Sequence, residues 1–229
     1  ISGFALRGGV LMGDISGMFD PSILSMIWET PPGDALVLRV LGLGAVLAGS
    51  VIGGRWIWLS VIGSAVAIWS FAKIGHVAVE KQFWLQIMLF IHLLTAAFWV
   101  GVFLPLHRLS RSRETMAQAA DIGHRFGQIA SLTVPLLLVT GVVLSWRLVG
   151  SVSALIGTSY GLVLLVKLAV VTLLLAFAAI NKTRLVPALR RGDPEVGSQL
   201  ARSISIEWAC VGAILLATAV FTSVLTVPS

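Results

Sequence analysis

Long apolar stretches alternate with short polar stretches along almost the whole chain. Each apolar stretch is close to the roughly 20 residues that a helix needs to cross the hydrocarbon core of a bilayer. We place six of them at residues 35–53, 56–72, 83–106, 126–149, 160–180 and 203–227. Because backbone groups in lipid must be satisfied internally, all six are predicted to be helices. The expected fold class is all-α, a polytopic membrane helix bundle of about six transmembrane helices.

The composition favours the same environment. Hydrophobic residues make up 57% of the 229 residues, charged residues make up 11%, and the mean hydropathy is +0.98. A soluble domain carries about 25% charged residues, so most of this surface needs lipid around it. The net charge of +6 comes from Lys and Arg in short connections, and no nucleic-acid partner is expected. Cys210 is the one cysteine, which excludes an internal disulfide and any CxxC motif.

We expect a single transmembrane domain over residues 1–229. Residues 1–33 are interpreted as an extracytoplasmic segment, and residues 34–229 as the six-helix bundle. Because the chain opens with Ile1 instead of Met, we expect it to be part of a longer chain.

The segment before the first apolar stretch has its own helix signals. Its start, through about Met12, resembles the end of an earlier membrane helix. Asp20-Pro21 is typical of a helix start, and the short helix that follows is predicted to end near Trp28, stopped by Pro31-Pro32.

Two kinds of residue inside the apolar stretches predict how the helices pack. Pro135 is expected to bend the fourth helix, because proline removes a helix hydrogen bond. Small residues on the first helix are expected to allow close contact with a neighbour; they are Gly42, Gly44, Gly49 and Gly53.

The basic residues predict an orientation. They gather in two connections, one at 107–126, interpreted as an ordinary basic loop, and one at 181–202, while residues 150–159 hold no Lys or Arg. Cytoplasmic loops of membrane proteins carry an excess of Lys and Arg. We therefore expect both basic connections in the cytoplasm and both ends of this chain outside it.

Ionisable residues inside membrane helices are costly, so they are candidates for function. His92, Lys167 and Glu207 are the ones we single out. Met88 lies one helical turn before His92 and Trp99 lies two turns after it, so these side chains share a helix face. Thioether and imidazole together suit Cu(I), whereas a histidine that only bonds a neighbouring helix, with Met88 filling space, explains the pattern equally simply.

Further candidates lie on both sides of the bundle. His76, Glu80 and the methionines of the first segment, Met18 among them, could capture metal outside. His124 and His107, with Glu207, could release it on the cytoplasmic side. Each of these residues also has an ordinary interpretation as a loop or packing residue. At a rise of ~1.5 Å per residue, His92 and Glu207 should lie more than ~10 Å apart in depth, so we expect separate points on one route.

Several stretches, taken in order, resemble the CopD/PcoD copper resistance family. The third apolar stretch has the pattern H-x6-W-x-G-x3-P-L from His92 to Leu106. The other matching stretches are Ser16–Pro21, Val139–Gly141, Val149–Gly161, Lys167-Leu168, Ala179–Pro187, Arg202–Glu207 and Thr222-Ser223. The resemblance implies an inner-membrane protein without enzyme activity that moves or handles copper, from the periplasm toward the cytoplasm. It places His92, Trp99, Lys167, Asn181 and Glu207 at family positions.

The interpretation therefore favours copper transport or handling in the bacterial inner membrane, with Cu(I) favoured over Cu(II). Membrane lipid is an expected partner, and a periplasmic copper-binding protein and a second copy of the chain are candidate partners. Two alternatives remain open at this stage: a b-type haem protein for electron transfer, and a membrane partner for copper-enzyme assembly. Haem needs axial ligands that face each other, and His92 is the one clearly intramembrane histidine.

Overall fold

The computed structural model describes residues 2–75, 82–193 and 195–223, which are helical with short turns and include no strand. It falls into two compact units, Ile1–Leu94 and Thr95–Ser229, whose boundary lies within helix α6 (Phe83–Ser110). The predicted all-α membrane fold is confirmed. The expectation of a single transmembrane domain stays a prediction.

Among the described residues, six helical segments are long and apolar enough to cross a membrane. They are Pro31–Ile52, Gly54–Lys73, Phe83–Ser110, Arg113–Val149, Ser159–Arg190 and Val196–Ala219. Each of the six predicted stretches overlaps one of these segments. Four of the segments extend past the apolar stretch that was predicted for them, at the end that carries Lys and Arg. The helix continues there although the sequence becomes charged.

The first unit begins with α1 (Ser2–Met12), a 3₁₀ turn at Ile15–Met18 and α2 (Pro21–Trp28). Asp20 caps α2 as predicted, since its carboxylate accepts the backbone N–H of Ser22 at 2.8 Å. The hydroxyl and N–H of Ser22, with the N–H of Ile23, hold the pKa of Asp20 below its ordinary value. The helix ends at Trp28 as expected.

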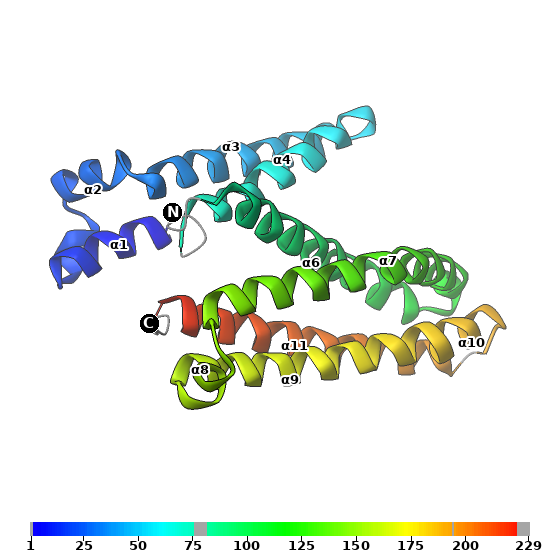
Figure 1. Cartoon of the computed structure of the whole chain (residues 1–229). Coiled ribbons are helices and arrows are strands. Elements are labelled where there is room, and N and C mark those ends of the chain that lie inside the picture. The colour runs from blue at the N-terminus through cyan, green and yellow to red at the C-terminus, as the bar shows by residue number, and fades with distance from the viewer. Residues whose placement is uncertain (1, 76–81, 194, 224–229) are drawn as a thin grey trace. The chain divides into compact units, whose positions relative to one another are not determined.

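Helices α3 (Pro31–Ile52) and α4 (Ile57–Trp69) form a hairpin in the first unit (Figure 1). A Cβ at Gly42 would lie 2.6 Å from the carbonyl oxygen of Gly63, and one at Gly49 would lie 2.5 Å from Ser60 Oγ. These two predicted close contacts are confirmed. Gly44, in contrast, faces open space, and Gly53 ends α3 with a positive φ of 69°, so the predicted packing role of these two glycines is wrong.

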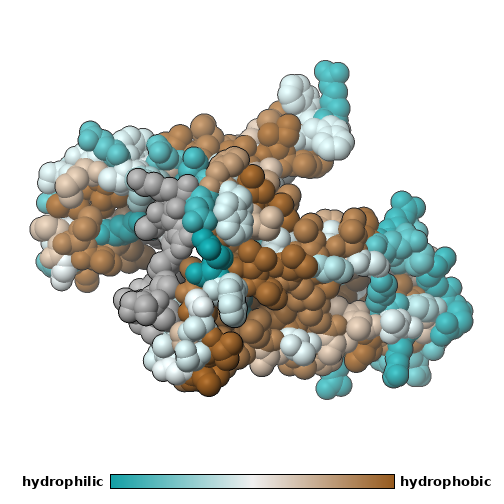
Figure 2. Space-filling view, viewed as in Figure 1, coloured by the Kyte–Doolittle hydropathy of each residue, from teal (hydrophilic) through white to brown (hydrophobic). Residues whose placement is uncertain are grey.

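The second unit contains the end of α6, α7 (Met116–Val149), the short α8 (Val152–Gly157), α9 (Ser159–Ile180), α10 (Val186–Arg190) and α11 (Val196–Ser223). Its core is formed by buried side chains from α6, α7, α9, α10 and α11, including Phe103, Leu200 and Ile204. Hydrophilic side chains of this unit gather at the end that carries the α6–α7 and α10–α11 connections (Figure 2).

Residues 107–126 are not the basic loop that the sequence suggested. Helix α6 continues to Ser110, a 3₁₀ turn covers Arg113–Thr115, and α7 starts at Met116. Helix α7 forms here because Ala119, Ala120 and Gly123 lie on one helix face, with Gly123 three to four residues after the two alanines. These residues are buried while the charged residues are exposed. Because the exposed residues are charged, hydropathy alone excludes this part of the helix from the apolar stretch. It therefore places the start of the helix about ten residues too late.

The same effect moves the start of α11. Val196, Leu200 and Ile204 repeat every four residues and are 6% exposed or less, whereas Arg202 is exposed. The helix therefore begins at Val196 instead of the predicted Ser203. Helix α7 is continuous through Pro135, and the predicted bend there stays a prediction.

Candidate functional site

A buried carboxylate in the second unit is the first element of the site. Glu207 lies on α11 and is 2% exposed. Its Oε1 accepts a hydrogen bond from the side-chain N–H of Asn181, which is itself buried. Among the described residues, no Lys, Arg or His forms an ion pair with Glu207. The amide of Asn181 is therefore the protein group that compensates for the burial of this carboxylate.

Asn181 reaches this position through an irregular turn. Residues Asn181–Leu185 form a π-helical turn between α9 and α10, in which the N–H of Val186 donates to the carbonyl of Asn181, five residues back. Pro187 follows and has no N–H to donate to the preceding turn. Such single π turns occur frequently at functional sites. Here the turn brings the first polar residue after the apolar helix α9 to the interior of the unit.

The pair faces a cavity of about 390 Å³ within the second unit. Its walls are mostly apolar and come from α6, α7, α9, α10 and α11, including Phe103, Val134 and Ile204. Its polar lining consists of Trp99, Ser131, Asn181, Lys182 and Glu207. The ammonium group of Lys182 donates to Ser131 Oγ, so α7 and the π turn are joined at the edge of the cavity.

Several buried polar atoms at this site have no hydrogen-bond partner among the described residues. They are Trp99 Nε1 and the side-chain oxygen of Asn181, whose residues line the cavity, and Oγ of Ser203, which lies one turn before Glu207 on α11 and does not line the cavity. Leaving a buried donor or acceptor unpaired costs about 1–3 kcal/mol. The polar part of the cavity offers a donor at Trp99 and an acceptor at Asn181, so it fits bound water or another polar occupant.

The donor chemistry of the cavity is oxygen-rich. Carboxylate and amide oxygens suit hard, hydrated cations better than Cu(I), which prefers thiolate and thioether sulfur. Cys210 is three residues beyond Glu207 and 5% exposed, but it does not line the cavity. The arrangement can hold water or a hydrated cation beside Glu207.

His92 and Met88, the predicted soft ligand pair, lie one turn apart on the part of α6 that belongs to the first unit. Both are half-buried. Trp99, seven residues further along α6, belongs to the second unit and is 6% exposed. The roles predicted for His92 and Met88 stay predictions.

His107 and His124, which the sequence predicted on the cytoplasmic side, do not form a cluster with Glu207 among the described residues. His107 Nε2 lies 3.2 Å from Ser205 Oγ on α11, and His124 is half-buried on α7. No group of three or more His, Cys, Asp or Glu side chains within the described ranges is placed to hold a metal ion. Any role of His124 in releasing metal would therefore be separate from that of Glu207.

The remaining predicted residues are scattered. His76 and Glu80 lie outside the described residues. Met18 is half-buried and faces α1, where a Cβ at Gly9 would lie 2.9 Å from its Cγ. Met12 and Met26 are 50% and 55% exposed. Lys167 is half-buried on α9.

Two features were missed in the sequence. The pairing of Asn181 with Glu207 links residues 26 positions apart and depends on the π turn, although a polar Asn after an apolar helix was a usable signal. Arg39, within α3, was not singled out. Its Nε donates to Ser70 Oγ at 3.1 Å, its guanidinium lies 4.3 Å from the ring centre of Phe71, and Nη2 has no partner among the described residues.

Fold and site together define a multi-pass, all-α membrane protein whose C-terminal unit holds a mostly apolar cavity lined by Glu207 and Asn181. Residues 120–221 match the model of the CopD family, described as Copper resistance protein D. The resemblance to this family is thereby confirmed over residues 120–221. They include Ser131, Asn181, Lys182 and Glu207, but not Trp99.

Two curated proteins are similar to the chain. Copper transport protein CutJ of Bacillus subtilis (strain 168) is 31% identical over 160 residues, which cover 67% of this chain and 28% of that protein. Inner membrane protein YebZ of Escherichia coli (strain K12) is 25% identical over 222 residues, which cover 93% of this chain and 74% of that protein. The chain thus spans little more than a quarter of the first relative. No solved structure gives a significant match.

Proposed function

We propose that the chain handles copper in the bacterial inner membrane and carries it from the periplasm toward the cytoplasm in copper resistance or homeostasis. The observation that supports this most is the overlap of two findings: the family match at 120–221 covers the helices that supply Glu207 and Asn181. The similarity to a protein named for copper transport and to one named for the inner membrane supports the substrate and the location.

In this proposal copper is the transported substrate and is bound at successive sites. We assign the site with soft ligands to His92 and Met88, whose imidazole and thioether suit Cu(I). A neutral imidazole is needed for metal binding, so uptake should weaken as the pH falls below the His pKa. Met18 and His76 are assigned to capture before this step.

The cavity at Glu207 is assigned to a second, polar step. An ion crossing an apolar bundle needs oxygen donors or water along its path. Glu207 and Asn181, whose side-chain oxygen has no partner among the described residues, provide such donors beside a cavity large enough for several waters. His124 is assigned to the release of copper toward the cytoplasm. Trp99 and Lys167 are assigned supporting roles, as family positions on α6 and α9.

Three partners belong to the same proposal. A periplasmic copper-binding protein would deliver the ion, membrane lipid surrounds the six spans, and a second copy of the chain would form a homo-oligomer. The ends of this chain are placed on the periplasmic side.

The test is cellular copper in a bacterial strain that lacks its own proteins of this family. Cells expressing this chain should accumulate more copper than cells with an empty vector, as measured by mass spectrometry of the metal. His92→Ala and Glu207→Gln should each lower the accumulation at least fivefold. Thr172→Ala is the matched control, because Thr172 is exposed on α9 and donates only to Leu168 of its own helix.

Equal accumulation in all three variants, at equal protein levels, would contradict the proposal. An optical spectrum of the purified protein tests the haem alternative. A strong Soret band would favour the haem alternative in place of copper handling.

A further inference from the structure

A single hydrogen bond joins two walls of the cavity beside Glu207. Lys182 follows Asn181 in the π turn, and its ammonium group donates to Ser131 Oγ on α7. Lys182 and Ser131 both line the cavity, and both are exposed. The bond therefore lies at a mouth of the cavity, where the cavity meets its surroundings.

The side chain of Lys182 lies along the surface of α7. Its Cγ, Cδ and Cε would lie 3.4, 3.7 and 3.8 Å from a Cβ at Gly127, so the missing side chain of this glycine makes room for them. Ser131 lies one turn after Gly127 and donates its hydroxyl to the Gly127 carbonyl oxygen at 2.9 Å. The Lys182 side chain thus spans the mouth from the π turn to the backbone of α7.

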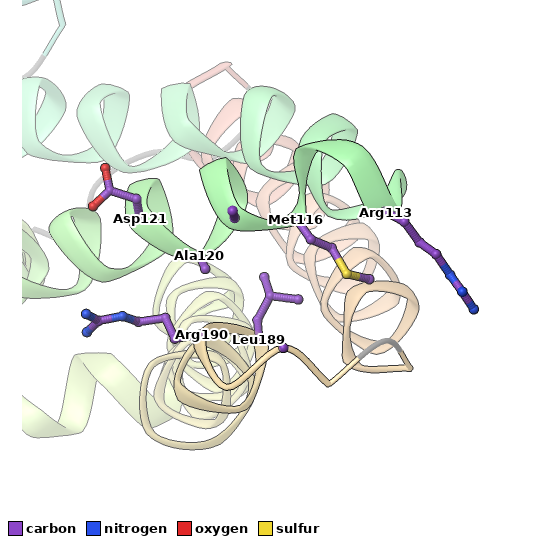
Figure 3. Close-up of a pocket in the computed structure, with 8 residues that line it drawn as sticks. Arg113, Met116, Ala120, Asp121, Leu189 and Arg190 are labelled. Carbon is purple, nitrogen blue, oxygen red and sulfur yellow. The ribbon is translucent and has the colours of Figure 1, made fainter.

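The direction of this side chain differs from that of a typical basic residue near the end of a membrane helix. Long basic side chains there extend toward water. The ammonium group of Lys182 instead bonds Ser131, the sixth residue of the apolar stretch 126–149. Arg113 and Arg190, in contrast, are exposed and point to opposite sides of the pocket that they line (Figure 3). Lys182 is thus turned back toward the bundle and held at the cavity.

The bond also fixes a positive charge at this mouth. Among the described residues, Lys182 forms no ion pair, so its charge is not neutralised by a carboxylate. A fixed positive charge beside a narrow path excludes cations. A cation can therefore pass this mouth, to or from Glu207, only after the ammonium group has moved away. The flexible four-carbon stem of lysine allows such a movement once the bond to Ser131 is broken.

We propose that Lys182 is a gate of the cavity. Bonded to Ser131, it closes the mouth to cations; released from Ser131, its side chain extends toward the basic end of the unit and opens the mouth. The closure follows from the contacts of Lys182 and does not depend on copper. The passage of copper through the open mouth rests on the proposed function.

The test is the rate at which a thiol inside the cavity is modified in the full chain, reconstituted in lipid nanodiscs. Val134 lines the cavity and is half-buried, so Val134→Cys in a Cys210→Ala background provides one reporter thiol. The reagents are a trimethylammonium-ethyl and a hydroxyethyl methanethiosulfonate, followed by mass spectrometry. Lys182→Ala should raise the rate of the cationic reagent about tenfold and that of the neutral reagent about threefold, because it removes both the charge and the stem.

Two further variants make the test specific. Arg184→Ala removes the same charge from an exposed residue of the same π turn that does not line the cavity, and should change both rates by less than about twofold. Ser131→Ala keeps the charge but removes its anchor, and should raise the rate of the cationic reagent about threefold.

Three results would overturn the proposal: an unchanged rate in Lys182→Ala, equal effects of Lys182→Ala and Arg184→Ala, or no effect of Ser131→Ala. Loss of the fold would raise both rates equally, so an equal rise for the two reagents in Lys182→Ala would also count against the gate. If the labelling follows the expected pattern in a chain that accumulates no copper, the gate stands and the proposed function fails.

Discussion

Glu207 illustrates how a single polar residue is accommodated inside a membrane helix bundle. Glu207 is 2% exposed and accepts a hydrogen bond from Asn181, whose side-chain oxygen has no partner in the described part of the chain and lies beside the cavity. Leaving either member of such a buried pair without its partner costs about 1–3 kcal/mol. We therefore expect Asn181 and Glu207 to act as one unit in stability as well as in function.

This coupling can be measured with apolar replacements of similar shape. Asn181→Leu and Glu207→Met should each lower the free energy of unfolding by about 1–3 kcal/mol, because each leaves a buried polar partner unpaired. The double variant should lose much less than the sum, since both polar groups are then gone. Unfolding by SDS in mixed micelles is the measurement.

Thr172→Val serves as the control for this cycle and should change stability by less than about 0.5 kcal/mol. Thr172 is exposed and donates its hydroxyl only within α9. If the double variant loses the full sum of the two single changes, the two side chains do not interact.

At the scale of single residues, only part of the site could be predicted from the sequence. Glu207 could be predicted as a candidate because a carboxylate in an apolar helix is costly. Its partner could not, because the contact joins α11 to the π turn at Asn181, and no local pattern places side chains 26 residues apart. Lys182 and Ser131 were missed for the same reason, since their bond spans 51 residues.

Among the elements, the α3–α4 hairpin depends on the absence of side chains at particular positions. Gly42 and Gly63 face each other so closely that a Cβ on either would lie 2.6 Å or less from the carbonyl oxygen of the other. Such contacts, lined by small residues, are how membrane helices approach without a hydrophobic driving force.

Two glycines of α3 provide a matched pair of substitutions. Gly42→Ala should destabilise the protein by about 1–3 kcal/mol, because the new methyl group meets backbone atoms of α4 and the helices must separate. Gly44→Ala faces open space and should be neutral or stabilising by up to about 1 kcal/mol, since alanine is the better helix former. Equal SDS unfolding midpoints for the two variants would contradict the close approach of α3 and α4 at Gly42.

The elements show where sequence patterns succeed. Asp20-Pro21 predicted the start of α2, because a cap and a proline act locally. Pro31-Pro32 follows the end of α2 at Trp28 as expected, and it also begins α3, since proline is favoured in a first helical turn. The starts of α7 and α11 were misplaced, because the first two turns of each helix are polar on one face and buried on the other.

At the scale of the whole molecule, the second unit separates its connections by charge. Arg113, before α7, and Arg190, at the end of α10, line one pocket and therefore lie at the same end of the unit. The connection at residues 150–158 has no Lys or Arg and joins α7 to α9 through α8. This asymmetry supports a cytoplasmic position for the basic end.

The orientation can be tested by cysteine labelling in a Cys210→Ala background, which has no other cysteine. Ser151→Cys should react with a membrane-impermeant maleimide in cells whose outer membrane has been opened. Ser112→Cys should react only after the inner membrane is also made permeable, because it lies in the basic connection. The reverse pattern would place the ends of the chain in the cytoplasm.

The most direct test of the account is copper uptake by the purified protein in sealed proteoliposomes. Vesicles with the chain should take up Cu(I) with time, whereas vesicles with His92→Ala or Glu207→Gln should fall close to empty vesicles and those with Thr172→Ala should match the unaltered protein. A protein that binds copper in the membrane but moves none of it inward would contradict transport and would favour a role in copper-enzyme assembly.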